Sequence, residues 1–156
     1  MFASFNIRSL HDKMHCVLDI LADGVDVLAL QETWHSTSDD YAVRNSVPPG
    51  YSIIDVPRSV DSTIADIRPQ RGGGVAIVHR STLLGRQLIL PSIFTSFEYV
   101  LVDLSCQTYH LLVISLYRSS SDPLSSKFFD DIKTLFEHLA MHSCTVIVLG
   151  DFNIHI

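Results

Sequence analysis

The sequence has few basic residues for a chain of its length. It carries 11 Lys and Arg residues against 17 Asp and Glu residues, which gives a formal net charge of −6 over 156 residues. Proteins that bind nucleic acid usually present a basic face, so this balance disfavours such a partner. Eight of the 11 basic residues are Arg, however, and the Arg side chain binds phosphate in a bidentate manner. A local arginine-lined groove is therefore compatible with the composition.

The patterns of a disulfide framework, a membrane span and a secretory signal are also missing. The three cysteines are an odd number at wide spacing, which suits reduced thiols better than a disulfide frame or a zinc site. No apolar run approaches the ~20 residues that cross a bilayer, and no basic stretch precedes a long apolar one at the N-terminus. We therefore expect a soluble intracellular protein, nuclear or cytoplasmic, with no membrane partner. The length suits one domain over residues 1–156.

Apolar runs with strand character alternate with two amphipathic helical patterns. Apolar residues recur at helical spacing from Leu10 to Leu21, and Asp122-Pro123 is a typical helix start ahead of a second apolar face. Polar residues, proline and glycine predict long loops at residues 36–50 and 57–74. This order predicts an α/β fold with mixed sheets and helices packed outside them. The expected strands are residues 2–7, 25–32, 51–56, 74–80, 98–104, 109–117 and 144–151.

Polar side chains follow four of these strands at the points where the strands end. In open α/β folds, ligands bind at the carboxyl ends of the strands. We therefore expect the four strand ends to face one cleft. The residues concerned are Asn6, Gln31, Glu32, Tyr117, Arg118, Asp151 and Asn153.

Two of these residues, Glu32 and Asp151, are carboxylates that would repel each other in one cleft. A divalent cation between or beside them removes the conflict. Carboxylate and amide oxygens are hard ligands, so the set favours Mg²⁺ (or Mn²⁺) over zinc, with substrate phosphate and water completing the shell. The residues therefore predict metal-assisted hydrolysis of a phosphate ester.

Five motifs carry a resemblance to a known superfamily. They occur in the order "FNIRSL", "LALQETW", "RGGGVAIVHR", "ISLYRSSS" and "VLGDFNIH". In this order and at these separations the chain resembles the endonuclease/exonuclease/phosphatase superfamily, whose fold is the four-layer DNase I-like α/β sandwich. The glycine-rich and tyrosine-containing motifs are most similar to the endonuclease domain of non-LTR retrotransposons. The resemblance implies a DNA-nicking endonuclease with DNA as its partner.

The resemblance also implies a metal site. The family's metal-binding glutamate matches Glu32, and the asparagine that ends its first strand and assists the metal matches Asn6. Repair enzymes of the family tend to carry a carboxylate where this chain has Arg8, and a guanidinium cannot ligate a cation. The resemblance therefore favours a single metal ion resting on Glu32.

The catalytic and substrate-binding residues follow from the same motifs. The family's aspartate that positions or activates the attacking water matches Asp151, and the asparagine that holds the scissile phosphate matches Asn153. The tyrosine that contacts the phosphate matches Tyr117. We expect Arg118, the next residue, to bind substrate as well.

The family's domain continues beyond the "GDFN" strand with further strands and a late Asp-His element, which no histidine of this sequence matches. We therefore expect the chain to represent the front two-thirds of the domain, incomplete at its C-terminal end. An uncovered sheet edge would favour self-association. Two alternatives stay open: a catalytically inactive remnant that serves as a nucleic-acid or protein interaction module, and a phosphatase or phosphodiesterase acting on small phosphorylated substrates.

Three features near these motifs have more modest interpretations. Gly72-Gly73-Gly74 precedes a strand and lacks the residues of a P-loop, so we expect a turn that passes close to the cleft. Trp34 is expected to pack beneath the site. Glu98 opens a strand, where it could support the site or be solvated.

Overall fold

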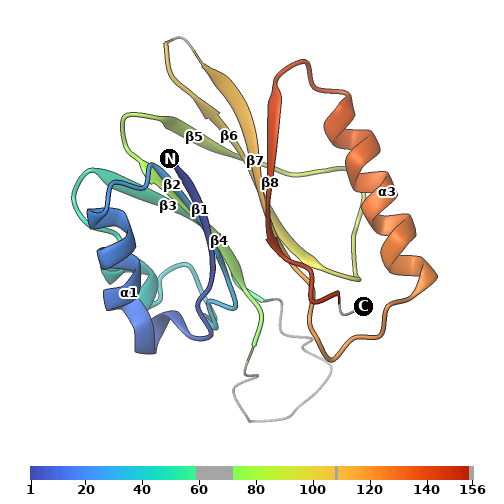
Figure 1. Cartoon of the computed structure of the whole chain (residues 1–156), viewed down its shortest axis with the longest axis horizontal. Coiled ribbons are helices and arrows are strands. Elements are labelled where there is room, and N and C mark those ends of the chain that lie inside the picture. Colours follow the sequence, from blue (N-terminus) through green and yellow to red (C-terminus); the bar gives the residue numbers. More distant parts are fainter. Residues whose placement is uncertain (59–71, 108, 155–156) are drawn as a thin grey trace.

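The fold consists of two four-stranded sheets packed face to face, with helices on the two outer faces (Figure 1). A computed structural model describes residues 1–58, 72–107 and 109–154. The first sheet has the order β1-β2-β4-β3 and the second the order β5-β6-β7-β8. The predicted α/β sandwich of mixed sheets flanked by helices is confirmed.

The first sheet is built from the N-terminal half of the chain. Strand β1 (Phe2–Asn6) pairs in parallel with β2 (Val27–Gln31), which pairs antiparallel with β4 (Val75–Arg80). Strand β3 (Tyr51–Val56) closes the other edge against β4. Helix α1 (Leu10–Ala22) and the short α2 (Tyr41–Asn45) cover the outer face of this sheet.

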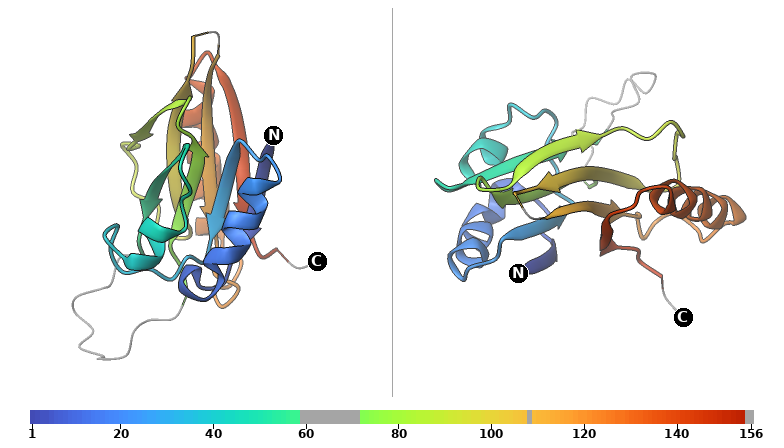
Figure 2. Two further views of the ribbon diagram at one scale, coloured as in Figure 1. Left: turned by 90° about the vertical axis from the view of Figure 1, so that its left-hand side faces the viewer. Right: turned by 90° about the horizontal axis from the view of Figure 1, so that it is seen from above.

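The second sheet follows the same plan. Strands β5 (Leu84–Leu88), β6 (Glu98–Ser105) and β7 (His110–Tyr117) pair antiparallel, and β8 (Thr145–Asp151) pairs in parallel with β7. Helix α3 (Ser126–Ala140) packs on the outer face, on the opposite side of the molecule from α1 (Figures 1 and 2). Strands β1 and β8 come close to each other along one side of the two sheets.

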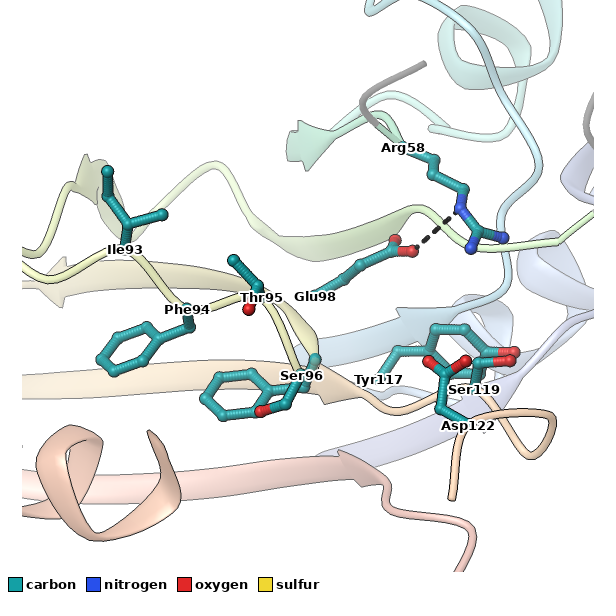
Figure 3. Close-up of a pocket in the computed structure, with 10 residues that line it drawn as sticks. Arg58, Ile93, Phe94, Thr95, Ser96, Glu98, Tyr117, Ser119 and Asp122 are labelled. Carbon is teal, nitrogen blue, oxygen red and sulfur yellow. Dashed lines mark ion pairs between the residues drawn. The ribbon is translucent and has the colours of Figure 1, made fainter. Parts of the chain in front are cut away.

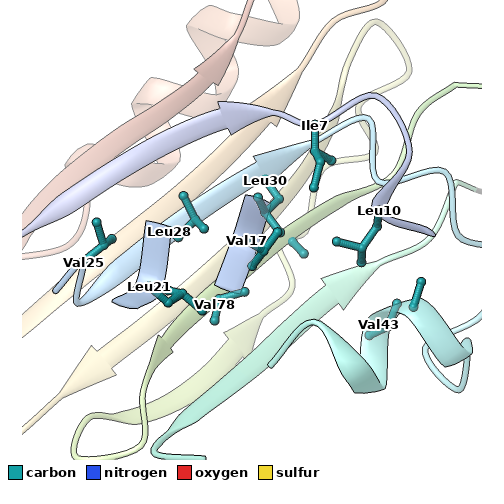
Figure 4. Packing of buried hydrophobic residues seen from close by; sticks show 11 residues of the cluster. Ile7, Leu10, Val17, Leu21, Val25, Leu28, Leu30, Val43 and Val78 are labelled. Atoms are coloured by element: carbon teal, nitrogen blue, oxygen red, sulfur yellow. The ribbon is translucent and has the colours of Figure 1, made fainter. Parts of the chain in front are cut away.

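Three apolar clusters hold the layers together, and the two-residue period of the strands separates them. Figure 4 shows the cluster between α1, α2 and the first sheet, to which Leu28, Leu30 and Val78 contribute. Alternate residues point the other way: Val75 and Ile77 meet the second sheet in a cluster between the sheets. Both faces of the central strands are therefore buried, which explains their continuous apolar sequences.

The structure corrects the predicted elements at three places. The range 36–50 is not all loop, because α2 forms within it with Asp40 as its N-cap. Strand β5 was not predicted. Helix α3 begins at Ser126 with Ser125 as its N-cap, not at Asp122-Pro123. The Asp122 carbonyl accepts a hydrogen bond from the Arg118 guanidinium, so it does not start the helical ladder. Residues 59–71 of the second predicted loop lie outside the described residues.

Within the part of the chain that the structure describes, no helix has the length and hydrophobicity needed to cross a bilayer.

Candidate active site

The ends of β1, β2, β7 and β8 lie together, as the positions of their polar residues predict. In the first sheet Asn6 pairs in register with Gln31, the residue before Glu32. In the second sheet Tyr117 pairs in register with Asp151. The Asn6 amide joins the two sheets, because its Nδ2 donates to Glu32 Oε1 at 2.8 Å and to Asp151 Oδ2 at 2.6 Å.

The Asn6 side chain also presents an unused acceptor. Its Oδ1 is buried and has no hydrogen-bond partner among the described residues. A buried polar atom without a partner costs about 1–3 kcal/mol, so such atoms call for a ligand. Two converging carboxylates and this amide oxygen fit Mg²⁺ or Mn²⁺ in chemistry. Over the described ranges no cluster of three or more His, Cys, Asp and Glu residues could hold a metal, so the candidate donor set combines carboxylate and amide.

The loops that carry these residues adopt a backbone conformation that is rare outside glycine. Arg8, Glu32, Trp34 and Asn153 all have positive φ, between 47° and 55°. Strained positions of this kind cluster at functional sites and persist where neighbouring contacts hold them. At Glu32 the neighbouring backbone does so, because the Ser9 amide donates to the Glu32 carbonyl at 2.9 Å.

The glycine-rich segment passes directly behind the loop that follows β2. The Thr33 amide donates to the Gly74 carbonyl at 3.2 Å, and the Trp34 amide donates to the Gly73 carbonyl at 3.0 Å. A Cβ atom on Gly74 would lie 2.4 Å from Thr33 Oγ1, and Gly74 has a φ of +83°. Only glycine fits this close approach. The segment therefore supports the loop that presents Glu32.

Tyr117 lies beside Glu32 and stays protonated over the usual pH range. Burial, the negative charge of Glu32 and a hydrogen bond with that carboxylate raise the pKa of Tyr117 to about 12. The carboxylate can only accept, so the phenol donates this hydrogen bond. Tyr117 is therefore a neutral hydrogen-bond donor at the centre of the site.

Asn153 follows β8 and is held by hydrogen bonds with two residues, Asp151 at the end of β8 and Arg118 just after β7. Its backbone amide donates to Asp151 Oδ1 at 3.1 Å, and its side-chain Nδ2 donates to the Arg118 carbonyl at 2.7 Å. The two oxygens of Asp151 thus accept from Asn153 and from Asn6, which fixes the orientation of this carboxylate.

Arg118 is placed differently from the expectation for a substrate-binding residue. Its side chain is buried and lies over the Phe128 ring, with the guanidinium carbon 5.4 Å from the ring centre. Its Nη1 donates to the carbonyls of Phe152 and Asn153 at 3.3 and 3.0 Å. These contacts hold the chain after β8 against the end of β7. A substrate role for Arg118 stays a prediction.

Trp34 does not pack beneath the site, so that prediction is wrong. The residue is 37% exposed, and its indole Nε1 donates to Glu32 Oε2 at 3.3 Å. The positive φ at Trp34 turns the chain so that the ring lies at the surface beside the carboxylate. Trp34 therefore helps to orient Glu32 from outside.

The structure also contains a buried His-Asp pair near the site, which the spacing of residues in the sequence does not indicate. His35 Nε2 lies 2.8 Å from Asp55 Oδ2, and His35 Nδ1 lies 2.7 Å from Thr33 Oγ1. Ser38 also donates to Asp55 Oδ2 at 2.7 Å. Burial raises the pKa of the Asp55 carboxyl, but the hydrogen bonds from His35 and Ser38 outweigh it and leave that pKa below its usual value. The pair ties the loop after β2 to strand β3.

Glu98 supports the glycine-rich segment from the second sheet. It accepts a hydrogen bond from the Gly74 amide and forms an ion pair with Arg58, whose Nε lies 3.5 Å from Glu98 Oε1. Burial raises the pKa of Glu98, and the negative charges of Asp122 and Glu32 add to this shift. Glu98 is therefore part of the site's surroundings and not a freely solvated strand end.

Known proteins show the same architecture. The human Nocturnin catalytic domain with bound sulfate superposes with a TM-score of 0.65 at 17% identity, over 97% of this chain and 62% of that one. The endonuclease domain of TRAS1, a telomere-specific non-LTR retrotransposon, gives 0.63 at 16% identity, over 98% and 58%. The 3′ phosphatase NExo from Neisseria, bound to a product DNA hairpin, gives 0.60 at 22% identity, over 97% and 56%.

The chain thus spans about three-fifths of the length of these structures, and the likeness concerns the fold. No curated protein matches the chain in sequence. The sequence model of the Endonuclease/Exonuclease/phosphatase family matches residues 3–155, which is nearly the whole chain. The chain belongs to the endonuclease/exonuclease/phosphatase family.

Proposed function

We propose that residues 1–156 form one domain that carries a divalent-metal-dependent phosphodiesterase centre, and that its substrate is DNA, which it nicks. The observation that supports this most is the Asn6 amide, which bridges Glu32 and Asp151 from the two sheets at 2.8 and 2.6 Å. The arrangement gathers two acidic groups around the Asn6 amide nitrogen, while the oxygen of the same amide is buried and unpaired. Such a set is unfavourable by itself and favourable around a cation.

Glu32 and Asn6 would hold the ion, which we propose to be Mg²⁺ or Mn²⁺. When bound, the ion would stabilise negative charge that develops on the phosphoryl oxygens. Trp34 and Tyr117 both donate hydrogen bonds to the Glu32 carboxylate. These donors keep the carboxylate oriented, in the way that outer hydrogen bonds orient metal ligands in general.

Asp151 is the proposed base. The oxygen of a water molecule would bond to the phosphorus atom while one proton of that water passes to the Asp151 carboxylate. The P–O bond to one sugar would break, and the leaving sugar oxygen would take up a proton from solvent to become a hydroxyl. The fixed orientation of Asp151 by Asn6 and Asn153 suits this role. Asn153 would donate a hydrogen bond to a phosphate oxygen through the second N–H group of its amide. The protonated Tyr117 phenol has a single O–H group, so with substrate bound it would donate to a phosphate oxygen in place of Glu32.

DNA as the substrate class is supported by several of the similar structures. Their descriptions include a retrotransposon endonuclease domain, a Danio rerio TDP2 in complex with a single-stranded DNA product, and NExo bound to a DNA hairpin. The net charge of −6 means that any attraction for DNA must come from local groups. We expect binding to weaken as salt rises, because phosphate contacts release counterions.

A small phosphate monoester is the second candidate substrate. The acidic net charge favours it, and a mannosyl-6-phosphatase from Bacteroides thetaiotaomicron is among the similar structures, at a TM-score of 0.64 and 16% identity. A salt titration separates the candidates, because binding of a small ester depends much less steeply on salt than binding of a polyanion. Salt-dependent binding that survives Glu32→Ala and Asp151→Ala, without any hydrolysis, would instead support an interaction module.

The experiment is nicking of supercoiled plasmid by the purified chain with Mg²⁺ or Mn²⁺. We expect nicking by the wild type, loss of nicking in Glu32→Gln and with a chelator, and a decrease of about 10²–10⁴-fold in Asp151→Asn. Glu137→Gln is the matched control, since Glu137 is an exposed carboxylate on α3 that pairs with Lys133 and belongs to none of the site motifs. A folded wild type that nicks no DNA with either metal would contradict the proposal.

We also propose that the chain self-associates through a sheet edge. The edge strands β1 and β8 lie next to each other at one side of the sandwich, and unpaired strand edges are templates for pairing with another chain. Sedimentation velocity measures this directly. A concentration-dependent shift towards a dimer supports the proposal, and a single monomer peak at all concentrations contradicts it.

A further inference from the structure

A cavity of about 390 Å³ opens beside the proposed catalytic centre (Figure 3). Its volume lies within the range of about 300–1,000 Å³ that is typical of small-molecule sites. Its walls come from β6, from β7, from the loops before β6 and after β7, and from Arg58 in the segment that follows β3. The residues that matter for its chemistry are Arg58, Phe94, Glu98, Tyr117, Ser119 and Asp122.

The cavity and the catalytic centre share one residue. Tyr117 lines the cavity, and its hydroxyl is hydrogen-bonded to Glu32. Glu98 stands next to Tyr117, because the two residues pair in register between β6 and β7. A group bound in the cavity would therefore adjoin a phosphate bound at Glu32.

One wall of the cavity is anchored to the underlying helix. The loop before β6 is tied to α3 by Asp131, whose Oδ2 accepts hydrogen bonds from the Ser96 hydroxyl at 2.7 Å and from the Ser96 amide at 3.3 Å. Ser92 in the same loop contacts His138 at 2.8 Å. Phe94 stacks on Phe97 with ring centres 5.2 Å apart. The wall is therefore held by packing and hydrogen bonds without any ligand.

The charges of the cavity disfavour a second phosphate. It contains two carboxylates, Glu98 and Asp122, and one guanidinium, Arg58, which is already paired with Glu98. This excess of negative charge disfavours an anion. It favours a neutral group that carries hydrogen-bond donors, because an ionised carboxylate only accepts. The half-buried Phe94 ring and the planar Arg58 guanidinium add surfaces that suit a flat ring.

We propose that this cavity binds the nucleobase next to the scissile phosphate and prefers a base with an exocyclic amino group. Glu98 and Asp122 accept from such an amino group, as Asp and Glu accept from the N4 amino group of cytosine in DNA complexes. Thymine has no exocyclic amino group and leaves both carboxylates without a donor of this kind. The inference rests on the proposed function, since it assumes that the phosphate binds at Glu32 and Asn6.

The test uses fluorescent single-stranded hexanucleotides that differ at one position, which carries cytosine, thymine or an abasic sugar. Each position is varied in turn. Both kcat/KM for cleavage and the dissociation constant are measured. At the position beside the cleaved bond we expect cytosine to be preferred over thymine by about tenfold, and the abasic sugar to be the poorest. Glu98→Gln and Asp122→Asn should each bring the cytosine-to-thymine ratio close to one.

Two variants are used because Glu98 also binds Gly74, so Glu98→Gln could disturb the site itself. The side chain of Asp122 lies on the other side of the cavity and is exposed, which makes Asp122→Asn the cleaner change. Asp39→Asn is the matched control, because Asp39 is an exposed carboxylate that does not line the cavity. This control should keep the wild-type preference.

The outcomes separate the two proposals. Cleavage with no base preference at any position in the wild type overturns the cavity inference and leaves the proposed function standing. Base-selective binding by a chain that cleaves neither the hexanucleotides nor supercoiled plasmid supports the cavity and counts against the proposed function. A preference that both variants retain overturns the assignment to Glu98 and Asp122.

Discussion

The buried pair of His35 and Asp55 should be one of the strongest single contributors to the stability of the site. Their side chains are 1% and 8% exposed, and His35 Nε2 lies 2.8 Å from Asp55 Oδ2. Asp55→Ala removes the acceptor of this bond and of the Ser38 hydroxyl at 2.7 Å. Each hydrogen bond to a charged group contributes about 1.5–3 kcal/mol. We therefore expect Asp55→Ala to lower the free energy of unfolding by about 3–5 kcal/mol.

A double-mutant cycle separates the interaction energy between His35 and Asp55 from the other energetic effects of the Asp55→Ala change. The variants are His35→Ala, Asp55→Ala and the double variant, and urea unfolding followed by circular dichroism gives their free energies. Groups in direct contact show coupling energies of about 0.5–3 kcal/mol. We expect the double variant to be less destabilised than the sum of the single variants by an amount in this range. Additive effects within about 0.5 kcal/mol would refute the pairing.

The same pair predicts a pH dependence with a defined sign. The pKa of Asp55 is lowered in the folded protein by His35 and Ser38, in spite of burial. Its contribution to stability is therefore complete above the unfolded pKa of about 3.9 and is lost as the pH falls through the lower folded pKa. The difference in unfolding free energy between wild type and Asp55→Asn should be constant near neutral pH and shrink below about pH 4. A difference that grows on acidification would contradict this assignment.

Three further changes test the surroundings of the site. In a urea titration, Gly74→Ala should lower the free energy of unfolding by about 1–3 kcal/mol more than Gly50→Ala. Both positions have φ near +90°, but only a Cβ atom at Gly74 would clash with Thr33. Equal losses would contradict the close approach. Tyr117→Phe should lower kcat by about 10²-fold. The shape of the pH-rate profile below pH 10 should not change, since the pKa of Tyr117 is raised to about 12. A fall in the wild-type rate at basic pH that is absent in the variant would instead show that the phenol ionises in this range. Arg118→Lys should lower the stability of the chain in thermal unfolding by about 1–3 kcal/mol, because the Lys ammonium cannot reach all the carbonyls that the guanidinium contacts. An unchanged stability with a raised KM would instead indicate that Arg118 binds substrate.

The fold could be predicted where hydrophobic pattern alone decides the structure. The central strands are buried on both faces and read as continuous apolar runs, as in "VLALQ" and "VAIVHR". Strand β5 has the sequence "LGRQL" and is largely exposed, so no apolar pattern indicated it. It forms because β6 offers an edge for backbone pairing. The five-residue helix α2 is similarly too short for a periodic signal.

The site could be predicted as far as strand ends and motifs define it. The structure brings Asn6, Glu32, Tyr117 and Asp151 together where β1, β2, β7 and β8 end. Contacts between residues that only the sheet topology brings together could not be predicted from the sequence pattern. His35 and Asp55 meet only because β3 and β2 flank β4 in one sheet.

Direct metal binding tests the central claim, which is that Asn6 and Glu32 hold one divalent ion beside Asp151. Mn²⁺ titration followed by electron paramagnetic resonance counts the bound ions and gives their affinity. We predict one ion per chain in the wild type and in Glu137→Gln, and an affinity at least about tenfold weaker in Asn6→Ala and Glu32→Gln. A folded wild type that binds no Mn²⁺, or variants that bind it as tightly as the wild type, would contradict the account.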